Sequence, residues 1–338
     1  MISIDAAVAD ASTAVARKRR GLRIAHLYPE LLNLYGDSGN ILVLRRRLEW
    51  RGLGCEVVEC HVDDRPSFSD VDIVFIGGGS DREQKIVCDK LLAEQAELKA
   101  YVEDGGVRGA VGGGYQLLGH SYLMGDEEAR GLSLVDLYTD RGSPRLIGNI
   151  AVESRISPQP VVGYENHGGR THLGPGVEPM GRVLYGHGND GTTGEEGCLY
   201  KNVVGTYVHG PLLPKNPGVA DYLISRALER RYGDGTLEPL DDTAELAANK
   251  VMYDRLMAGE VKEYRLVRRR TAPRSQRRLL VRQRTEVQEM PHAQRRAHGA
   301  ARAEGRVCLA AQPHEVGRGH RGHQTLGRNQ QGRARHGG

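Results

Sequence analysis

The 338-residue chain has few cysteines and contains no long hydrophobic run. Its five cysteines form no CxxC pair and share no metal-ligand spacing with histidine, which argues against zinc and against a disulfide framework and favours a reducing cytoplasm. No apolar stretch approaches the roughly 20 residues that a membrane-spanning helix needs, and the amino terminus lacks the apolar core of a secretory signal. These absences predict a soluble cytoplasmic protein that could also work at the inner face of the membrane.

Aromatic residues and charges are unevenly distributed along the chain. Thirteen of the 14 tyrosines, the one tryptophan and both phenylalanines precede residue 262. Beyond residue 261 the chain carries 19 Lys and Arg against five Glu, a net charge of +14, whereas the first 261 residues carry 28 against 38, a net charge of −10. Only the first part therefore has the composition of a folded core.

The two ends of the chain are expected to lie outside that core. Residues 1–20 are Ala-rich, end in a basic run and are expected to be a disordered extension. Residues 259–338 are expected to form an Arg-rich tail that is either disordered or the translation of GC-rich DNA in a shifted reading frame. The shifted frame is favoured, because an RNA-binding tail usually interleaves aromatic residues or regular RGG units. In either case its charge predicts nonspecific affinity for nucleic acid.

Between residues 21 and 258, strand and helix patterns alternate, which predicts an α/β sheet with helices on both faces. Strands are expected at 22–27, 56–60, 72–76, 146–152, 161–164, 183–185 and 203–208, and helices at 40–51, 85–103, 219–232 and 242–257. The run at 72–76 leads into three glycines, as a buried parallel strand entering a tight loop does. The short strands after residue 133 are interpreted as the second half of the same domain.

Five glycine-rich motifs occur in one order along this part of the chain. They are Tyr28–Asn40, Gly77–Gln84, Ala110–Gly119, Gly163–Gly168 and Gly205–Gly210. In this order they resemble class I glutamine amidotransferases of the cobyric acid synthase type, and the first motif and the length most resemble the GatD-type subunits of lipid II isoglutaminyl synthases. The resemblance covers residues 21–258 and implies a flavodoxin-like α/β fold with one mixed, mainly parallel sheet.

The resemblance implies a catalytic constellation with one member missing. In the family a cysteine thiolate at a sharp strand-to-helix turn attacks the side-chain amide of glutamine, a histidine serves as base and then acid, and backbone N–H groups hold the oxyanion. The histidine is His209, while Gly112 occupies the position of the cysteine. The N–H groups of Gly113 and of Gly78 or Gly79 would form the oxyanion hole. Hydrolysis by this chain is therefore expected to be lost.

Further residues are assigned through the same resemblance. Arg145 matches the position that meets the glutamine substrate, and a guanidinium fork suits an α-carboxylate. Gln116, one helical turn past residue 112, is expected to pack beneath the turn at the substrate site. Glu165 and His167 are expected to shape a loop rather than to react. Pro211 stands where many class I enzymes have an acid that orients the histidine, and this branch resembles a Cys-His dyad without such an acid. No metal site is expected.

One stretch departs from the family pattern. The strand before residue 112 should be apolar, yet Arg108-Gly109 interrupts it and places a charge where a buried strand is expected.

The implied function is release of ammonia from L-glutamine and its transfer, within a heterodimer, to a MurT-like Mur ligase. That partner would use ATP and Mg²⁺ to amidate the D-glutamate of the lipid II stem peptide, and this chain would carry no cofactor. The alternatives are a cobyric-acid-type amidotransferase, a catalytically inactive scaffold for the synthetase, and a nucleic-acid binder acting through its tail. Cobyric-acid-type enzymes usually carry a fused synthetase domain, and this chain has no P-loop.

Removal of residues 262–338 should weaken retention on heparin while leaving the melting temperature nearly unchanged, because this segment has a charge of +14 and no apolar periodicity. Elution from heparin with a salt gradient and a thermal melt measure the two effects. A marked fall in melting temperature would mean that the tail packs on the folded part.

Overall fold

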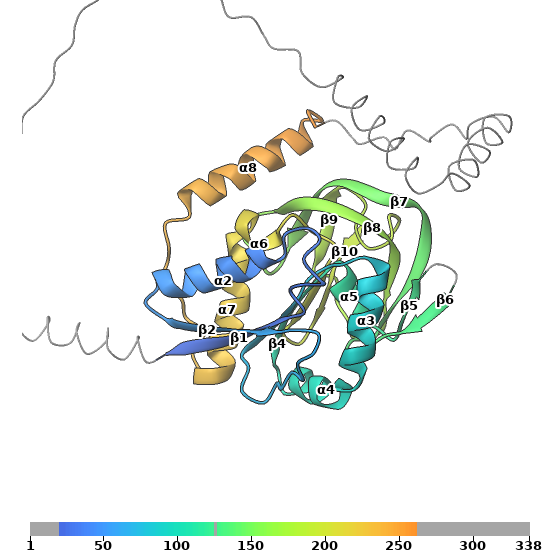
Figure 1. Ribbon diagram of the computed structural model, residues 1–338. Coiled ribbons are helices and arrows are strands. Elements are labelled where there is room, and N and C mark those ends of the chain that lie inside the picture. Colours follow the sequence, from blue (N-terminus) through green and yellow to red (C-terminus); the bar gives the residue numbers. More distant parts are fainter. Residues whose placement is uncertain (1–19, 125–126, 262–338) are drawn as a thin grey trace, which may run out of the picture. The chain divides into compact units, whose positions relative to one another are not determined.

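The computed structural model describes residues 20–124 and 127–261, so the expectations for the two ends of the chain lie outside the described residues (Figure 1). None of the helices in the described ranges is long and apolar enough to cross a membrane.

The first sheet has the strand order of a flavodoxin-like fold. Its strands, in spatial order, are β2 (Gly54–Cys60), β1 (Gly21–Leu27), β3 (Ile73–Ile76), β4 (Val107–Val111), β12 (Val203–Thr206) and β11 (Cys198–Tyr200). All neighbours pair in parallel except β11, which runs antiparallel to β12. The predicted fold class is therefore confirmed for this sheet, which is mixed and mainly parallel.

Helices cover both faces of this sheet, as predicted. On one face α2 (Ser38–Trp50) and α7 (Pro217–Tyr232) pack with the sheet in one hydrophobic cluster. On the other face α3 (Asp81–Leu92), α4 (Gln95–Glu103) and α5 (Gly113–Leu117) share a second cluster. Local sequence explains the ends of α7, because a proline begins the helix and the left-handed Gly233 closes it.

The single helix expected over residues 85–103 is wrong, because the structure has two helices there. A capping box between Ser80 and Glu83 starts α3 earlier than expected. Bonds of the i→i+3 type from Ala93 and Glu94 then close α3, and α4 begins one residue later. The break contains neither glycine nor proline, so the sequence pattern gives no signal for it.

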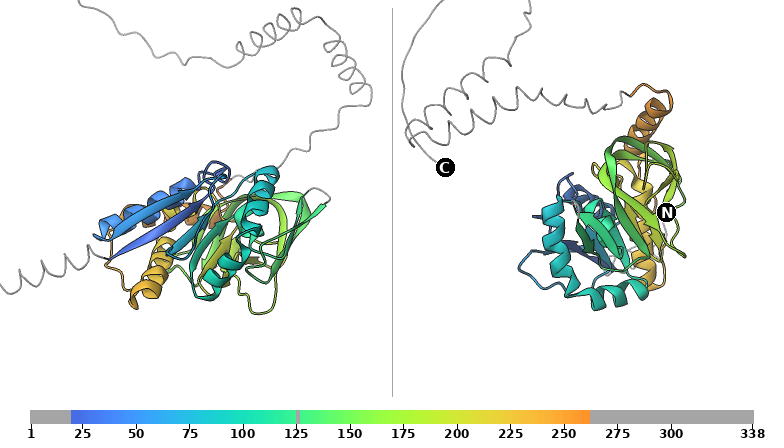
Figure 2. Two further views of the ribbon diagram at one scale, coloured as in Figure 1. Left: turned by 60° about the horizontal axis from the view of Figure 1, so that its bottom comes forward. Right: turned by 90° about the vertical axis from the view of Figure 1, so that its right-hand side faces the viewer.

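The second half of the described chain completes the first sheet with β12 and β11, but most of its strands form a separate sheet. Figure 2 shows its green and yellow strands beside the blue and teal strands of the parallel sheet. The strands are β10 (Glu195–Glu196), β9 (Gly181–Tyr185), β7 (Leu137–Ser154), β5 (Ser121–Met124) and β6 (Glu127–Arg130), with β8 (Val161–Leu173) paired to β7. Two helices, α6 (Leu212–Lys215) and α8 (Thr243–Met257), complete the elements, and α8 packs on β7 and β8.

Strands β7 and β8 are much longer than the predicted strands because several glycines inside them do not form turns. A Cβ on Gly163 would lie 2.8 Å from the carbonyl oxygen of His209, and one on Gly169 would lie 2.5 Å from Nε2 of Gln116. These glycines therefore mark close approaches between the second sheet and the site described below.

A buried ion-pair network joins α2 to the carboxyl-terminal helices. Arg47 is 2% exposed and donates to the carboxylates of Asp221 and Asp242 at 2.6 to 2.8 Å, and Arg51 also donates to Asp221.

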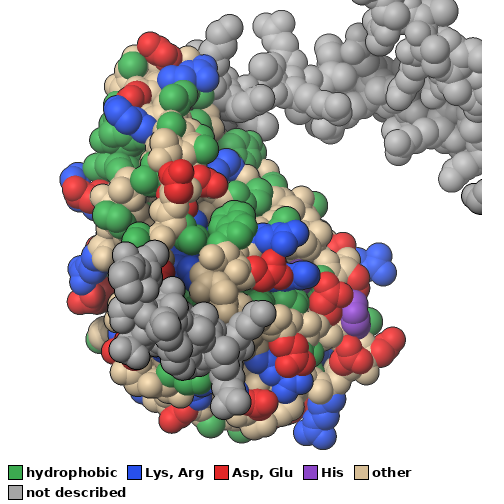
Figure 3. All heavy atoms as spheres, turned by 90° about the vertical axis from the view of Figure 1, so that its left-hand side faces the viewer, with side chains coloured by type: hydrophobic (Ala, Val, Ile, Leu, Met, Phe, Trp, Pro, Cys, Tyr) green, Lys and Arg blue, Asp and Glu red, His purple; other side chains and the backbone are tan. Residues whose placement is uncertain are grey.

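On the face drawn in Figure 3, acidic and basic side chains are intermixed rather than gathered by sign. Charge on this face therefore works in local pairs, not as a field of one sign.

Arg108 lies in the middle of β4 and is fully buried without a partner. Its backbone pairs with Val74 on one side and Val203 on the other. The side chain has no exposed surface, and none of its three nitrogens has a hydrogen-bond partner among the described residues. Burial lowers the pKa of Arg108 to about 10. The interruption expected from the sequence is therefore a real electrostatic defect in the core.

Replacing Arg108 with leucine should stabilise the fold, because the guanidinium remains charged at pH 7 and is buried unpaired. The lowered pKa corresponds to a penalty on the order of 3 kcal/mol in the free energy of unfolding. Urea unfolding of Arg108→Leu measures the gain. The matched control is Arg46→Leu, since Arg46 is half-exposed on α2 and its ion pair with Glu49 is worth little. Equal effects in the two variants would contradict this account of Arg108.

Candidate active site at the carboxyl edge of the parallel sheet

The residues singled out from the sequence come together around one cavity of about 730 Å³. All seven line it: Gly78, Gly79, Gly112, Gly113, Gln116, Arg145 and His209. The glycines and His209 follow directly after β3, β4 and β12, whose carboxyl ends meet at the same edge of the sheet. Ligands of open parallel sheets bind at such an edge. Arg145 comes from β7 of the second sheet.

Gly112 has the backbone of a nucleophile elbow. Its φ of 58° and ψ of −114° lie where L-amino acids are strained, and α5 begins at the next residue. The N–H of Gly112 donates to the carbonyl of Thr206 on β12 at 2.9 Å, which fixes the turn beside the end of that strand. A Cβ on Gly112 would lie 2.5 Å from Cε1 of His209. The imidazole therefore occupies the space next to the missing side chain.

His209 is buried and uncharged. Its backbone pairs with Tyr164 of β8, and the Tyr35 ring lies 4.3 Å from its own ring, centroid to centroid. The side chain is 2% exposed, and its Nδ1 has no hydrogen-bond partner within the described ranges. Burial lowers the pKa of His209 to about 3, and the nearby His167 and Arg145 add to the shift. The ring can accept a proton only if a compensating negative charge stands beside it.

The N–H groups expected to form the oxyanion hole are not equivalent. The N–H of Gly78 donates to the Asp37 carboxylate at 3.0 Å. Within residues 20–124 and 127–261, no hydrogen bond engages the N–H of Gly79 or of Gly113. Of the two alternatives that the sequence left open, this arrangement favours Gly79 as the partner of Gly113.

Arg145 and Gln116 are both held by neighbours. The Arg145 guanidinium is bonded to Asn166: Nε donates to Oδ1 at 2.6 Å, and Nη2 donates to the backbone oxygen at 2.9 Å. The amide of Gln116 accepts from Gln84 at 3.0 Å and donates to the Tyr207 hydroxyl at 3.1 Å. Among the described residues no hydrogen bond engages Nη1 of Arg145, whereas the Gln116 amide is bonded at both ends.

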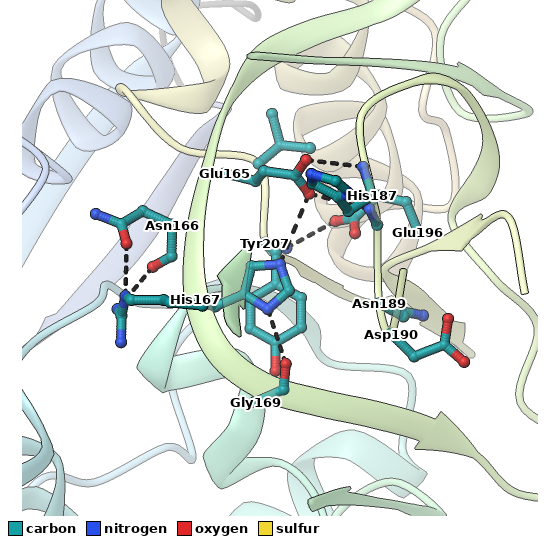
Figure 4. Close-up of polar contacts among 12 residues, drawn as sticks. Glu165, Asn166, His167, Gly169, His187, Asn189, Asp190, Glu196 and Tyr207 are labelled. Carbon is teal, nitrogen blue, oxygen red and sulfur yellow. Dashed lines mark hydrogen bonds and ion pairs between the residues drawn. The ribbon is translucent and has the colours of Figure 1, made fainter. Parts of the chain in front are cut away.

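Glu165 and His167 shape the wall behind the cavity. The buried Glu165 carboxylate accepts the N–H groups of His187 and Gly188 at 2.8 and 3.0 Å (Figure 4). The His167 ring stacks on Tyr207 with 3.6 Å between centroids. Glu165 therefore fixes a turn of the second sheet, and His167 packs against the residue two positions before His209.

The described part of the chain has no cysteine at the cavity. Cys55, Cys60, Cys88 and Cys198 are free, and none lines the cavity. Burial raises the pKa of Cys198 to about 12, so its thiolate is inaccessible at neutral pH. The described residues also contain no group of three or more His, Cys, Asp and Glu that could hold a metal ion.

Sequence reasoning missed Tyr35, Asn166 and Tyr207, which line the cavity, and Asp37, which bonds the neighbouring Gly78. All four belong to the quoted glycine-rich motifs, so membership of a motif was the available signal. The motifs do not show which of their residues contact the site, because each contains several polar residues and the fold decides which of them point inward.

Comparisons with known proteins identify similar sequences. The CobB/CobQ-like glutamine amidotransferase domain matches residues 23–217. The GatD subunit of the glutamine-hydrolysing lipid II isoglutaminyl synthase of Staphylococcus aureus (strain N315) is 43% identical over 235 residues, which are 69% of this chain and 96% of that subunit. The corresponding subunit from Streptococcus pneumoniae (strain ATCC BAA-255 / R6) is 40% identical over 63% of this chain and 82% of its own.

More distant matches cover less or rest on shape alone. Cobyric acid synthase of Listeria innocua serovar 6a is 30% identical over 44% of this chain but only 30% of its own length. A crystal structure of a glutamine amidotransferase aligns with 60% of this chain and 98% of its own at a TM-score of 0.41 and 15% identity. By the match over residues 23–217 and the 43% identity across nearly all of a curated relative, this chain belongs to the CobB/CobQ-like glutamine amidotransferase family.

Proposed function

We propose that this chain is the glutamine-binding subunit of a lipid II isoglutaminyl synthase. The observation that carries the proposal is that all five sequence motifs contribute residues to one cavity. The chain is also 43% identical to a GatD subunit over 96% of that subunit's length. A cobyric-acid-type activity has weaker support, because the match covers only 30% of those larger synthases.

Each lining group then has a role toward glutamine. The free Nη1 of Arg145 would meet the α-carboxylate, with Asn166 holding the rest of the guanidinium in place. The N–H groups of Gly79 and Gly113 would stabilise the oxyanion that forms on the side-chain amide. In relatives with a cysteine at position 112, the thiolate would displace ammonia to form a glutamyl thioester, and water would release glutamate. His209 would take the thiol proton and give it to the leaving ammonia.

As written, the chain lacks that reaction, and a non-hydrolysing role is the second candidate function. Glycine at position 112 provides no nucleophile, and none of the described cysteines lines the cavity. His209 is neutral. The cavity and its binding groups remain. A chain of this kind would still bind glutamine and its synthetase without releasing ammonia.

The partner that we propose is a MurT-like Mur ligase. It would use ATP and Mg²⁺ to activate the D-glutamate carboxylate of the lipid II stem peptide, and ammonia from an active glutaminase subunit would convert it to the amide. The complex would be a cytoplasmic heterodimer that meets lipid II through the ligase. Nonspecific binding of nucleic acid by the basic tail remains a separate prediction.

The chain as written should release ammonia from L-glutamine at no more than the buffer rate, because loss of a covalent nucleophile costs several orders of magnitude. A coupled ammonia assay with the partner present measures the rate. Turnover comparable to that of a cysteine-restored variant would contradict both the role of position 112 and the exclusion of the other cysteines.

The double variant Arg108→Leu/Gly112→Cys should recover glutaminase activity. Cysteine at φ 58° is strained by about 1 to 3 kcal/mol, and its Cβ forces the His209 ring to move, so the leucine is included to offset the loss of stability. In this background His209→Ala should abolish turnover. Arg145→Ala should mainly raise KM, since its contact is shared by the ground and transition states. A strong fall in kcat at unchanged KM for Arg145→Ala would overturn its assignment.

Co-expression with a MurT-like ligase should yield a stable complex for the parent chain and for the restored variant alike, because position 112 lies inside the cavity. Only the restored variant should amidate lipid II with glutamine, whereas both complexes should do so with added ammonium chloride. Mass spectrometry of the stem peptide distinguishes these outcomes. Amidation of a corrin precursor instead would exclude the lipid II assignment and leave the family intact.

A further inference from the structure

We propose that Asp37 is a positioning residue for the oxyanion hole, because its carboxylate and the adjacent backbone fix the peptide planes of the Gly77–Gly79 loop. This inference rests on the proposed function, which gives the Gly79 N–H its role. Asp37 belongs to the first glycine-rich motif, between β1 and α2, and touches neither the cavity nor the place of the substrate.

The peptide between Gly77 and Gly78 is held from both sides. The N–H of Gly78 donates to Oδ2 of Asp37 at 3.0 Å. Its other end, the carbonyl of Gly77, accepts the N–H of Gly114 in the elbow helix at 3.1 Å. Asp37 and the elbow therefore clamp one peptide plane between them.

The next peptide, between Gly78 and Gly79, is held at only one end. The carbonyl of Gly78 accepts the N–H of Leu34 at 3.0 Å. Because N–H and C=O point in opposite directions across a trans peptide, this bond turns the Gly79 N–H away from the Leu34 segment. That N–H has no partner among the described residues and belongs to a residue that lines the cavity. The motif from Leu34 to Asp37 thus orients the Gly79 N–H, which is one of the two donors left open beside the elbow.

Close packing ties the loop to the position of Asp37. A Cβ on Gly77 would lie 2.7 Å from Cβ of Asp37 and 2.2 Å from the carbonyl oxygen of Leu32. A Cβ on Gly79 would lie 2.9 Å from the carbonyl oxygen of Leu31. The loop consists of glycines because the motif approaches it at backbone distance, so a shift of the Asp37 side chain is transmitted to the loop.

The carboxylate is kept in a place that disfavours its charge. Asp37 has no exposed surface, and burial raises its pKa to about 6 against the opposing effect of the Gly78 N–H. The groups facing it are the N–H of Gly78 and the side-chain amide of Asn40, and the ionisable group on the far side of Gly78 is the uncharged His209. Between pH 3.8 and about 6 the folded state binds more protons than the unfolded state, so ionised Asp37 destabilises the fold at neutral pH.

If Asp37 only stabilised the fold, its substitution would lower stability and leave kcat unchanged. A positioning role predicts a higher melting temperature for Asp37→Asn together with a lower kcat. Asp37→Asn removes the buried charge, so the melting temperature at pH 7.5 should rise, and the difference from the parent should vanish below about pH 4. In the Arg108→Leu/Gly112→Cys background, Asp37→Ala should lower kcat on the order of 10- to 100-fold with little change in KM, since a misplaced oxyanion donor acts on the transition state. The kcat of Asp37→Asn should lie between those of Asp37→Ala and of the restored background, because the asparagine oxygen can still accept the N–H of Gly78.

The parent chain gives a direct test that needs no turnover. With ¹⁵N-glycine labelling, the Gly78 amide, identified by its loss in Gly78→Ala, should shift with pH around a midpoint near 6 and stay flat in Asp37→Asn. Asp63→Asn, which changes an exposed aspartate, is the control and should keep the titration, the melting temperature and the rate. A flat Gly78 signal in the parent, or an unchanged kcat in Asp37→Ala, overturns the inference. Absence of glutaminase activity in the restored background would instead overturn the proposed function, while the Gly78 titration still decides whether Asp37 fixes the loop.

Discussion

The site depends on the register of β4 between its two parallel neighbours. Ala110 pairs with Ile76 of β3, and Val111 pairs with Thr206 of β12. Because β4 is bonded on both sides, the strand ends at a fixed height, and the turn at Gly112 falls beside the glycine loop after β3 and just before His209. A slip of one residue would turn every side chain of β4 to the opposite face and separate these three loops. The catalytic frame is therefore a consequence of sheet pairing.

The same strand carries both departures from the family pattern, and they act on different properties. Arg108 places an unpaired charge in the core, which lowers stability without touching the cavity. Gly112 tolerates a backbone that a side chain would strain, so glycine favours the fold there, and under the proposed function it leaves the site without its nucleophile. Within five residues, Arg108 thus lowers the stability of the fold and Gly112 raises it. The hydrogen bond that shapes the turn, from Gly112 to Thr206, is present.

The parallel half of the fold was predictable, whereas the second sheet was not. Apolar runs such as 72–76 followed by glycines identify buried parallel strands, and the order of the motifs placed seven residues at one cavity. The strand predicted at 161–164 stopped short of Gly168 and Gly169, because nothing in the sequence tells a glycine in a bend from one at a close backbone approach. Asp37 went unrecognised for a similar reason, since a single aspartate in a loop carries no local mark of burial.

The electrostatics of the cavity are those of a site built around a negative charge. The Arg145 guanidinium and the open N–H groups of Gly79 and Gly113 favour an anion beside the elbow, and burial, which lowers the pKa of His209, keeps the imidazole uncharged unless such an anion is present. A thiolate at position 112 would supply it and would raise the pKa of the histidine by forming an ion pair. Without that sulfur the imidazole stays neutral, and it occupies the space where a Cβ at position 112 would lie. Under the proposed function, glycine at position 112 therefore removes the nucleophile and also the charge that would make His209 basic, while the hydrogen bonds that hold Gly112 and Arg145 are present.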